Sequence, residues 1–254
     1  MPPKILSEQQ IHDFHRDGFL FVKNPFDAKR TQEIITWVDD VQNYPEAPGK
    51  YLMYFEPSLL EPGKKLLHRM ENLYDYHKGF HELFDSDLLR GATSDLFGEQ
   101  SILFKDKINF KFPGGIPFDW HQDHQAGWWD YGELFITALI CIDKVTQDNG
   151  PLELAAGFHK QGLIGHKWKP MTDEQVEGME FVPCYLEPGD MVFFDSFIPH
   201  GSGPNMSDHS RRVLYITYGR LSEGDSRAQY YKDKARSLPQ DCEREPGKEY
   251  KYRV

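Results

Sequence analysis

The segment FDWHQDHQAGWW, residues 118–129, places three metal-binding side chains within four positions and follows them with two tryptophans. The three side chains are His121, Asp123 and His124. In an extended strand, residues i and i+2 point to the same face, so His121 and Asp123 are expected to reach one metal ion while His124 points away. We therefore predict that His121 and Asp123 are two ligands of one metal.

A third ligand has to come from another strand, and His200 fits this role best. It follows the apolar run MVFFDSFIP and opens the turn HGSGPN, a suitable place for a ligand at the mouth of a barrel. Two neutral imidazoles and one carboxylate leave open positions on an octahedral ion, which suits non-haem Fe(II) and oxygen activation. The pattern therefore predicts an iron site that can bind further ligands.

The first part of the chain has the sequence pattern of helices. Ser7 and Gln10 form a capping-box signature, and Gly18 is placed to end the helix that they begin. Residues 28–42 and 80–97 carry apolar side chains at helical spacing. We expect these helices to pack on one sheet of the β-rich part that follows.

The second part contains short β-branched and aromatic runs, separated by turns rich in Gly and Pro. The runs are ILFKDKINFKF, FITALICID, LELAAGF, DMVFFD and RVLYITYG. This pattern predicts a mainly β fold, a two-sheet barrel or jelly roll with a helical flank. We expect one domain over residues 1–254, with a helical part at about 1–98, the barrel at about 99–222 and a C-terminal tail at 223–254.

Composition excludes several classes of partner. The net charge is −11, which argues against nucleic acid, and no apolar run approaches the roughly 20 residues that span a bilayer. Cys141, Cys184 and Cys242 are widely spaced and form no CxxC pair, so neither a disulfide framework nor a structural zinc site is indicated. We expect a cytoplasmic protein, and nothing in the sequence indicates an oligomeric state.

An arginine connects the predicted ligands with a known family. Arg211 lies eleven residues after His200, at the start of RVLYITYG, where a guanidinium pointing into the barrel can bind a carboxylate through two hydrogen bonds. This pattern resembles the phytanoyl-CoA dioxygenase family of Fe(II)/2-oxoglutarate oxygenases. The resemblance runs from DGFLFV through WHQD and QDNGPLELAAGFHKQG to EPGDMVFFDSFIPHGSGPN, and so covers most of the chain.

The resemblance implies a double-stranded β-helix, also called a cupin-like jelly roll, and a dioxygenase that depends on Fe(II), 2-oxoglutarate and O2. Such an enzyme hydroxylates a C–H bond of a small molecule and releases succinate and CO2. By the same resemblance, His121, Asp123 and His200 would bind Fe(II), and Arg211 would bind the distal carboxylate of 2-oxoglutarate.

Further contacts follow from the similarity of INFKFPGG, HxD and NGPL to ectoine hydroxylase, a member of the same family. It points to Asn109 and Thr137 as inward-facing polar contacts of the cosubstrate, and to Lys105 as another. Leu139 stands where some relatives have a tryptophan. Halogenating relatives have a small residue in place of the ligand carboxylate, so Asp123 favours hydroxylation over halogenation.

Several side chains fit two interpretations. Lys105, Lys107 and Lys111 alternate along one strand, which suits either a solvated face of the sheet or a wall of the cosubstrate site. Trp128 and Trp129 suit either the core or an aromatic wall over the open face of the iron. Neighbouring residues of an extended chain point in opposite directions, so we expect only one of the two tryptophans to face the site.

Other residues are expected away from the metal. His124 and His209 are expected at the surface or behind the ligands, and Arg212 is expected on the outer face because it neighbours Arg211. Residues 43–79, which are rich in aromatic and turn residues, are expected to form a lid that determines the substrate.

Two other classes of function fit parts of the pattern. A metallohydrolase would use the HQDH cluster to hold a zinc-bound water, but would need further histidines upstream of Trp120, where none is close. A non-catalytic barrel would bind a small molecule without bringing the three ligands together. For the oxygenase, the acidic chain lacks a recognisable basic patch for CoA phosphates, which favours a small polar metabolite as the substrate.

Overall fold

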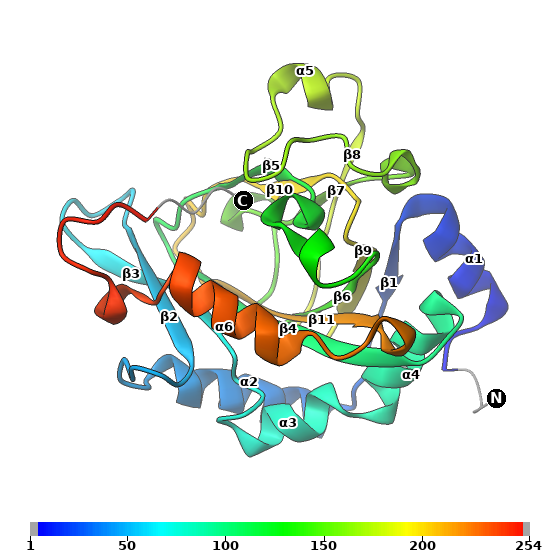
Figure 1. The fold of residues 1–254 in the computed structure, drawn as a ribbon, viewed down its shortest axis with the longest axis horizontal. Helices are drawn as coiled ribbons and strands as arrows, with labels where there is room; N and C mark the ends of the chain where they lie inside the picture. Colours follow the sequence, from blue (N-terminus) through cyan, green and yellow to red (C-terminus); the bar gives the residue numbers. More distant parts are fainter. Residues whose placement is uncertain (1–4, 251–254) are drawn as a thin grey trace.

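Two facing antiparallel sheets form the centre of the computed structural model, which describes residues 5–250 (Figure 1). The larger sheet contains, in spatial order, β1 (Phe19–Val22), β9 (Met191–Asp195), β6 (Ile136–Cys141), β11 (Arg211–Arg220), β4 (Ser101–Lys111), β3 (Lys65–Glu71) and β2 (Leu52–Pro57). The smaller sheet contains β5 (Phe118–His121), β10 (His200–Ser202), β7 (Glu153–Ala155) and β8 (Phe181–Pro183). The mainly β fold predicted from the sequence is confirmed.

The space between the sheets is the interior of the barrel. Leu139, Val192 and Tyr215 of the larger sheet belong to one buried apolar cluster with Leu154 of the smaller sheet and Ile198. Along each central strand, alternate residues point to this interior and to the opposite face. The smaller sheet and the α5 helix (Asp173–Val176) cover the larger sheet from above (Figure 1).

Four helices pack against the larger sheet, three over its other face and one, the first in the chain, beside its edge strand β1 (Figure 1). They are α1 (Glu8–Asp17), α2 (Ala28–Gln42), α3 (Lys78–Phe84) and α4 (Asp87–Phe97). Ile34, Phe80 and Leu89 from these helices share a fully buried cluster with Ile108 and Ile216 of the sheet. This apolar layer makes the sheet a rigid support for the side chains on its inner face.

Local signals in the sequence explain the ends of the helices. The side chain of Ser7 accepts a hydrogen bond from the backbone of Gln10, and Gly18 ends α1 with a φ of 85°, as predicted. The predicted helix at 80–97 is instead two helices, because Ser86 caps the start of α4 by accepting from the backbone of Leu89.

The part predicted as helical, residues 1–98, also contains strands β1, β2 and β3. The hairpin of β2 and β3 extends the larger sheet beyond β4, so the expectation that residues 43–79 form a lid is wrong. The inner faces of these strands carry Tyr54, Arg69 and Glu71, which are buried despite their polar groups. Burial of charged residues hides the alternation by which a strand is recognised in a sequence.

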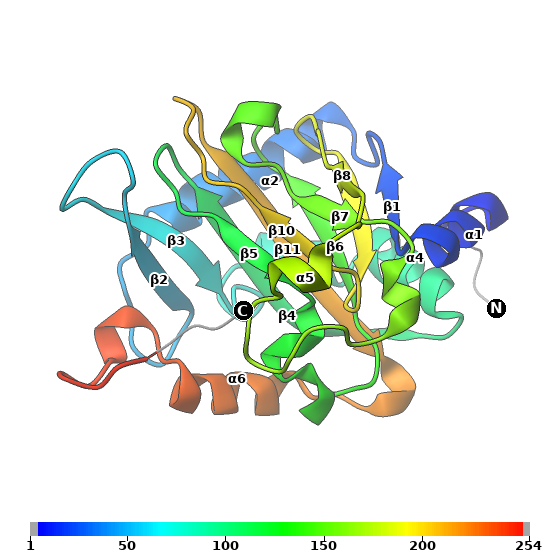
Figure 2. The ribbon, with the colours of Figure 1, turned by 90° about the horizontal axis from the view of Figure 1, so that it is seen from above.

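The C-terminal segment forms part of the barrel wall. Its helix α6 (Arg227–Ser237) runs beside β4 and β2 (Figure 2). Lys234 of α6 forms an ion pair with Glu71 at 2.7 Å, and Arg227 forms one with Asp106 at 2.7 Å. Among residues 5–250 we find no helix with the length and apolar character that crossing a membrane requires.

Candidate active site and metal centre

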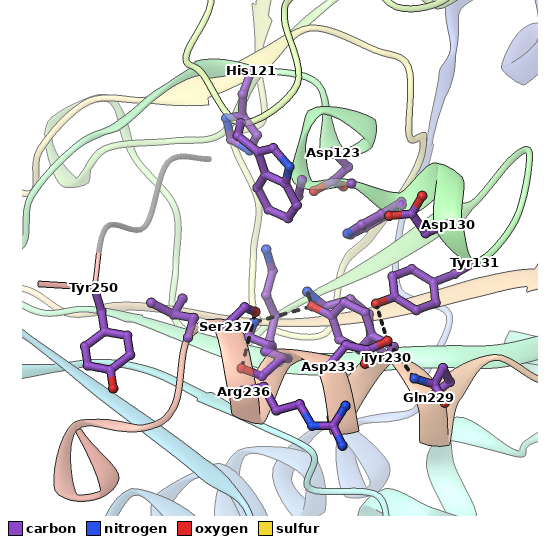
Figure 3. Close-up of a pocket in the computed structure, with 18 of the residues that line it drawn as sticks. His121, Asp123, Asp130, Tyr131, Gln229, Tyr230, Asp233, Arg236, Ser237 and Tyr250 are labelled. Atoms are coloured by element: carbon purple, nitrogen blue, oxygen red, sulfur yellow. Dashed lines mark hydrogen bonds between the residues drawn. The ribbon is translucent and has the colours of Figure 1, made fainter. Parts of the chain in front are cut away.

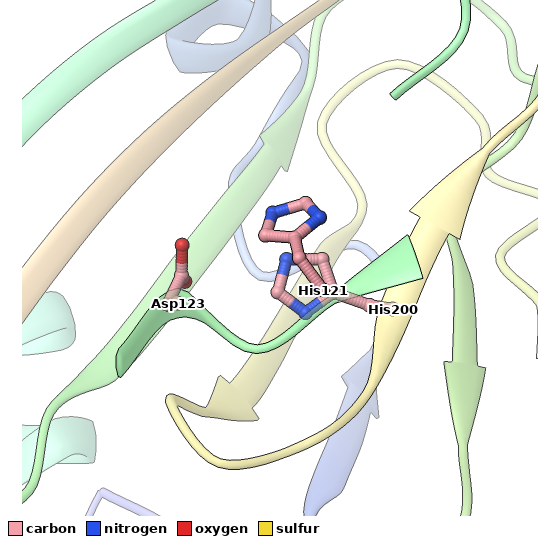
Figure 4. A group of neighbouring side chains, drawn as sticks. All are labelled: His121, Asp123 and His200. Atoms are coloured by element: carbon pink, nitrogen blue, oxygen red, sulfur yellow. The ribbon is translucent and has the colours of Figure 1, made fainter. Parts of the chain in front are cut away.

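Three predicted ligands meet at one end of the barrel (Figure 4). His121, Asp123 and His200 each offer a ligand atom, and these atoms all lie within 4.8 Å of one another. His121 ends β5 and pairs with His200, the first residue of β10, so that their rings lie 4.2 Å apart. Asp123 and His200 are buried. The structure therefore brings together the three residues that the sequence singled out.

Asp123 reaches this group by a different route from the one predicted. Strand β5 ends at His121, and Asp123 begins a short 3-10 helix, Asp123–Ala126. The side chain of Gln125 accepts a hydrogen bond from the backbone of Gln122, which holds the chain in this turn. The turn, rather than the alternation of a strand, directs the carboxylate towards the two histidines.

Backbone carbonyls fix which nitrogen of each histidine is free. Nδ1 of His121 lies 2.7 Å from the carbonyl oxygen of Asp119, and Nδ1 of His200 lies 2.9 Å from that of Ile198. A carbonyl only accepts, so each Nδ1 carries the proton and each Nε2 keeps a lone pair for a metal. Burial lowers the pKa of His121 to about 3, assisted by His200, and also lowers the pKa of His200, so both rings are neutral.

The remaining histidine of the HQDH segment is not at the surface. His124 is fully buried, and its ring stacks on Phe197 at 4.1 Å and meets Trp129 edge-on at 4.5 Å. It supports the turn that carries Asp123 and lies outside the ligand group. His209 is exposed, in agreement with the prediction.

Strand register determines which polar side chains enter the barrel. On β11, Arg211 pairs with Lys111 of β4, and two positions further Val213 pairs with Asn109. Directly paired residues share a face of the sheet, so Arg211 and Asn109 point inward with the interior residue Val213. The next residue, Arg212, points to the outer face, as predicted, where it forms ion pairs with Asp39 and Asp143.

The guanidinium of Arg211 is 1% exposed and has few partners in the described structure. One nitrogen lies 3.4 Å from the hydroxyl of Ser202, while Nε has no hydrogen bond within residues 5–250. The carboxamide oxygen of Asn109 is also buried without a partner in this part of the chain. A buried cation and an unpaired amide are costly unless a ligand satisfies them, so this end of the barrel suits an anionic ligand.

The other predicted cosubstrate contacts differ in their surroundings. Thr137 faces inward on β6 and shares a hydrogen bond of 2.9 Å with Thr217, so its hydroxyl already has a partner. Leu139 lies in the apolar cluster between the sheets. Lys105 is near the opposite end of the inner face of β4, where its ammonium donates to the hydroxyl of Tyr230 at 2.9 Å.

A cavity of about 860 Å³ opens beside the ligand group and extends to α6 (Figure 3). Its walls include His121 and Asp123 together with side chains from β4, from α6 and from the turn after Asp123; these are Lys105, Lys107, Trp128, Tyr131, Tyr230 and Asp233. Lys105 and Lys107 therefore line the cavity, whereas Lys111 is buried and donates to Ser202 and Gly203, so this face of β4 is not a solvated face of the sheet.

The two tryptophans have different environments. Trp128 lines the cavity, is 2% exposed, and packs against Phe104 and Tyr230 in an aromatic cluster. Trp129 is 46% exposed and contacts His124 from outside. Only one tryptophan faces the site, as expected, although both lie in a 3-10 helix and not in an extended strand.

A buried group of charges beneath the cavity was not predicted. Glu71 forms ion pairs with Arg69 at 2.8 Å and with Lys234 at 2.7 Å, and lies 3.9 Å from Lys105. Burial alone would raise the pKa of Glu71, but these cations outweigh it and hold the pKa far below its usual range. The residues of this charged group come from strands β3 and β4 and from helix α6, which lies far away in the sequence. No local sequence motif therefore indicates the group.

Comparison with known proteins identifies the family. A sequence profile described as "Phytanoyl-CoA dioxygenase (PhyH)" matches residues 14–213. The chain belongs to the phytanoyl-CoA dioxygenase family. It is therefore a dioxygenase that uses Fe(II), 2-oxoglutarate and O2, and the triad supplies a fitting set of metal-binding residues. This assignment decides against the metallohydrolase and against the non-catalytic barrel.

Full-length relatives of this family are similar over nearly the whole chain. A 2-aminoethylphosphonate dioxygenase from uncultured bacterium HF130_AEPn_1 is 38% identical over 246 residues, which covers 96% of this chain and 93% of the relative. A methylphosphonate hydroxylase from Gimesia maris is 33% identical over 238 residues, covering 92% and 89%.

A solved structure supports the fold. The crystal structure of EctD from S. alaskensis with 2-oxoglutarate and 5-hydroxyectoine has a TM-score of 0.74 and 20% sequence identity, and covers 88% of this chain and 79% of that one. The predicted double-stranded β-helix is thereby confirmed.

Proposed function

We propose that this enzyme hydroxylates a C–H bond of a small organophosphonate. Two relatives that match over most of the chain are named for phosphonate substrates, 2-aminoethylphosphonate and methylphosphonate. The cavity beside the triad, at about 860 Å³, is in the range of small-molecule sites. It supports the preference for a small polar metabolite over an acyl-CoA.

The convergence of His121, Asp123 and His200 is the observation that carries the catalytic part of this proposal. Each imidazole would bind Fe(II) through Nε2, because its Nδ1 is held by a backbone carbonyl, and Asp123 would be the anionic ligand. When bound, Fe(II) and 2-oxoglutarate supply the oxidising chemistry: O2 places one oxygen atom in the substrate C–H bond and the other in succinate, and CO2 leaves. The protein positions the C–H bond and limits access of water.

Arg211 would bind the distal carboxylate of 2-oxoglutarate. Its guanidinium is buried on the inner face and its Nε has no partner within residues 5–250. Asn109, with its unpaired buried oxygen, would be a second polar contact. Thr137, another proposed contact, already shares a hydrogen bond with Thr217, so we expect a smaller effect from it. We do not assign Lys105 to the cosubstrate, because it lies six residues from Lys111 along β4 and donates to the hydroxyl of Tyr230 beside α6.

An optical titration tests the metal assignment. Anaerobic addition of 2-oxoglutarate to the Fe(II) enzyme should give a weak visible charge-transfer band, and Asp123→Ala should lose this band and all substrate-coupled formation of succinate. Asp119→Ala is the matched control, because this exposed side chain lies two residues before His121, which contacts only the backbone of Asp119. Full activity of Asp123→Ala without added carboxylate would contradict the triad.

The proposed setting is the cytoplasm. Cys141, Cys184 and Cys242 are all free thiols in the structure, in keeping with a reducing compartment. The net charge of −11 supports a small-molecule substrate and no nucleic-acid partner.

A further inference from the structure

The inner part of the cavity carries more positive charge than its carboxylates balance. Arg69, Lys105 and Lys234 all lie within 3.9 Å of one carboxylate, Glu71. Lys107 adds a fourth cation to this region, and within residues 5–250 its ammonium has no hydrogen bond or ion pair. Of these four cations, Lys107 is the one that forms no ion pair with a carboxylate within residues 5–250.

The position of Lys107 directs its ammonium to the metal end of the cavity. On the sheet it pairs with Glu71 of β3 on one side and with Tyr215 of β11 on the other, and its ammonium lies 4.8 Å from the centre of the Tyr215 ring. It lines the cavity together with His121 and Asp123. Burial lowers the pKa of Lys107 to about 8, assisted by Lys105, while the charge of Asp123 opposes the shift.

Such an ammonium is costly in the free protein. Removing a cation from water without a partner is unfavourable, and the penalty is recovered when an anion binds beside it. Within residues 5–250 the ammonium of Lys107 contacts an aromatic ring but no hydrogen-bond acceptor or anion. A half-buried lysine of this kind that faces a cavity is therefore better explained by an anionic ligand than by a role in stability.

We propose that Lys107, with Lys105 beside it, binds the anionic headgroup of the substrate and so holds the adjacent carbon near the metal ligands. The inference deepens the proposed function and rests on it, since it assigns the phosphonate to particular residues. Lys105 and Lys107 are two positions apart on β4 and face the same side, roughly 7 Å apart along the strand. Ammonium groups can donate to a tetrahedral oxyanion from several directions, which suits a phosphonate.

Helix α6 keeps these two charges available. Lys234 donates to both oxygens of Glu71 at 2.7 Å, whereas Lys105 stays 3.9 Å from that carboxylate. The ammonium of Lys105 is held by the hydroxyl of Tyr230 at 2.9 Å and lies 5.3 Å from the centre of the Trp128 ring. Glu71 is thus engaged by α6, and the cations of β4 remain for a ligand.

The competing assignment is that Lys107 binds 2-oxoglutarate. The affinities for methylphosphonate and for 2-oxoglutarate separate the two assignments. Both are measured by calorimetry on the anaerobic Fe(II) enzyme, and methylphosphonate is titrated in the presence of 2-oxoglutarate. Lys107→Met should weaken methylphosphonate binding by roughly 10- to 100-fold, the loss expected for a charge-assisted hydrogen bond. The dissociation constant of 2-oxoglutarate should change by less than about twofold.

Two control variants refine the result. Lys107→Arg keeps the charge and should retain most of the affinity for methylphosphonate. Lys167→Met removes the same charge from an exposed lysine that pairs with Asp130 near the cavity, and should bind like the wild type. Equal weakening by Lys167→Met would show a general effect of charge and would overturn the subsite.

Stability provides a second measurement, independent of ligand binding. Lys107→Met should raise the melting temperature of the ligand-free protein by about 1–4 °C, because it removes a poorly compensated charge. A lower melting temperature together with unchanged methylphosphonate binding would mark Lys107 as structural and overturn the inference.

The proposed function is tested separately in the same samples. If the visible band forms but Lys107→Met binds methylphosphonate like the wild type, or loses 2-oxoglutarate instead, the subsite is wrong and the oxygenase assignment stands. If no band forms in the wild type, the metal assignment fails, whatever the phosphonate titration shows.

Discussion

The two ends of the inner face of β4 carry the same residue type in different environments. Lys111, beside Arg211, is enclosed and donates hydrogen bonds to the hydroxyl of Ser202 and the carbonyl of Gly203. Burial lowers the pKa of Lys111 to about 5, assisted by Arg211, so this lysine is neutral at pH 7. Lys107, four residues earlier on the same face, lines the cavity.

On our proposal, this difference lets one strand serve two ligands. At the enclosed end, the neutral lysine would leave Arg211 as the charged group that binds the distal carboxylate of 2-oxoglutarate. At the open end, Lys105 and Lys107 face a space shared with α6, where substrates of different shape can be accommodated. We therefore assign the cosubstrate to the enclosed end and the substrate to the open end.

The largest expected effect is at the enclosed end. Arg211→Ala should raise the dissociation constant of 2-oxoglutarate by on the order of 100-fold, because it removes a bidentate, charge-assisted partner. Arg212→Ala is the control, since Arg212 points to the outer face and pairs with Asp143. Calorimetry on the anaerobic Fe(II) enzyme measures both, and a larger effect at Arg212 would mean that the interior face of β11 is assigned wrongly.

The next effect depends on pH and belongs to the open end. The pKa of Lys107 is lowered to about 8, so Lys107 is protonated below this pH and loses its charge as the pH rises through it. Methylphosphonate affinity should therefore fall above pH 8 by up to about tenfold per pH unit. Lys107→Arg should lose this dependence, because a guanidinium stays protonated. If the affinity for methylphosphonate fell equally with pH in the wild type and in Lys107→Arg, the titrating group would not be Lys107.

The smallest effect concerns the aromatic wall. Trp128→Ala should weaken methylphosphonate binding by about 1 kcal/mol, because the ring that packs near the ammonium of Lys105 is lost. Trp129→Ala should change the affinity by less than about twofold, since Trp129 is exposed. Thermal melts on both variants separate binding from folding, and an equal loss of affinity in the two would contradict the assignment of Trp128 to the cavity.

Much of the metal centre and of the enclosed end around Arg211 could be predicted from the sequence. The HxD pair, His200 and Arg211 are recognisable by their spacing, and strand alternation correctly separated Arg211 from Arg212. The capping residues of α1 and the apolar spacing of α2 predicted those helices because their signals are local. The 3-10 turn at Asp123 was missed, because it depends on the side chain of Gln125 bonding back to the backbone.

The open end could be predicted only in part. The ion pair of Lys234 with Glu71 joins residues 163 positions apart, and neither residue has a local pattern that indicates burial. Strands β2 and β3 were missed for the same reason, since their inner faces carry charges whose partners come from other elements. The sequence left two interpretations open for Trp128 and for Lys107. Only the fold shows that the side chains of both residues line the cavity.

A crystal structure of the anaerobic complex with Fe(II), 2-oxoglutarate and methylphosphonate tests the division of ligands between the two ends most directly. We predict phosphonate oxygens within about 3 Å of Nζ of Lys107, and the distal carboxylate of 2-oxoglutarate on the guanidinium of Arg211. A phosphonate bound to Arg211, or 2-oxoglutarate bound through Lys107, would contradict the account.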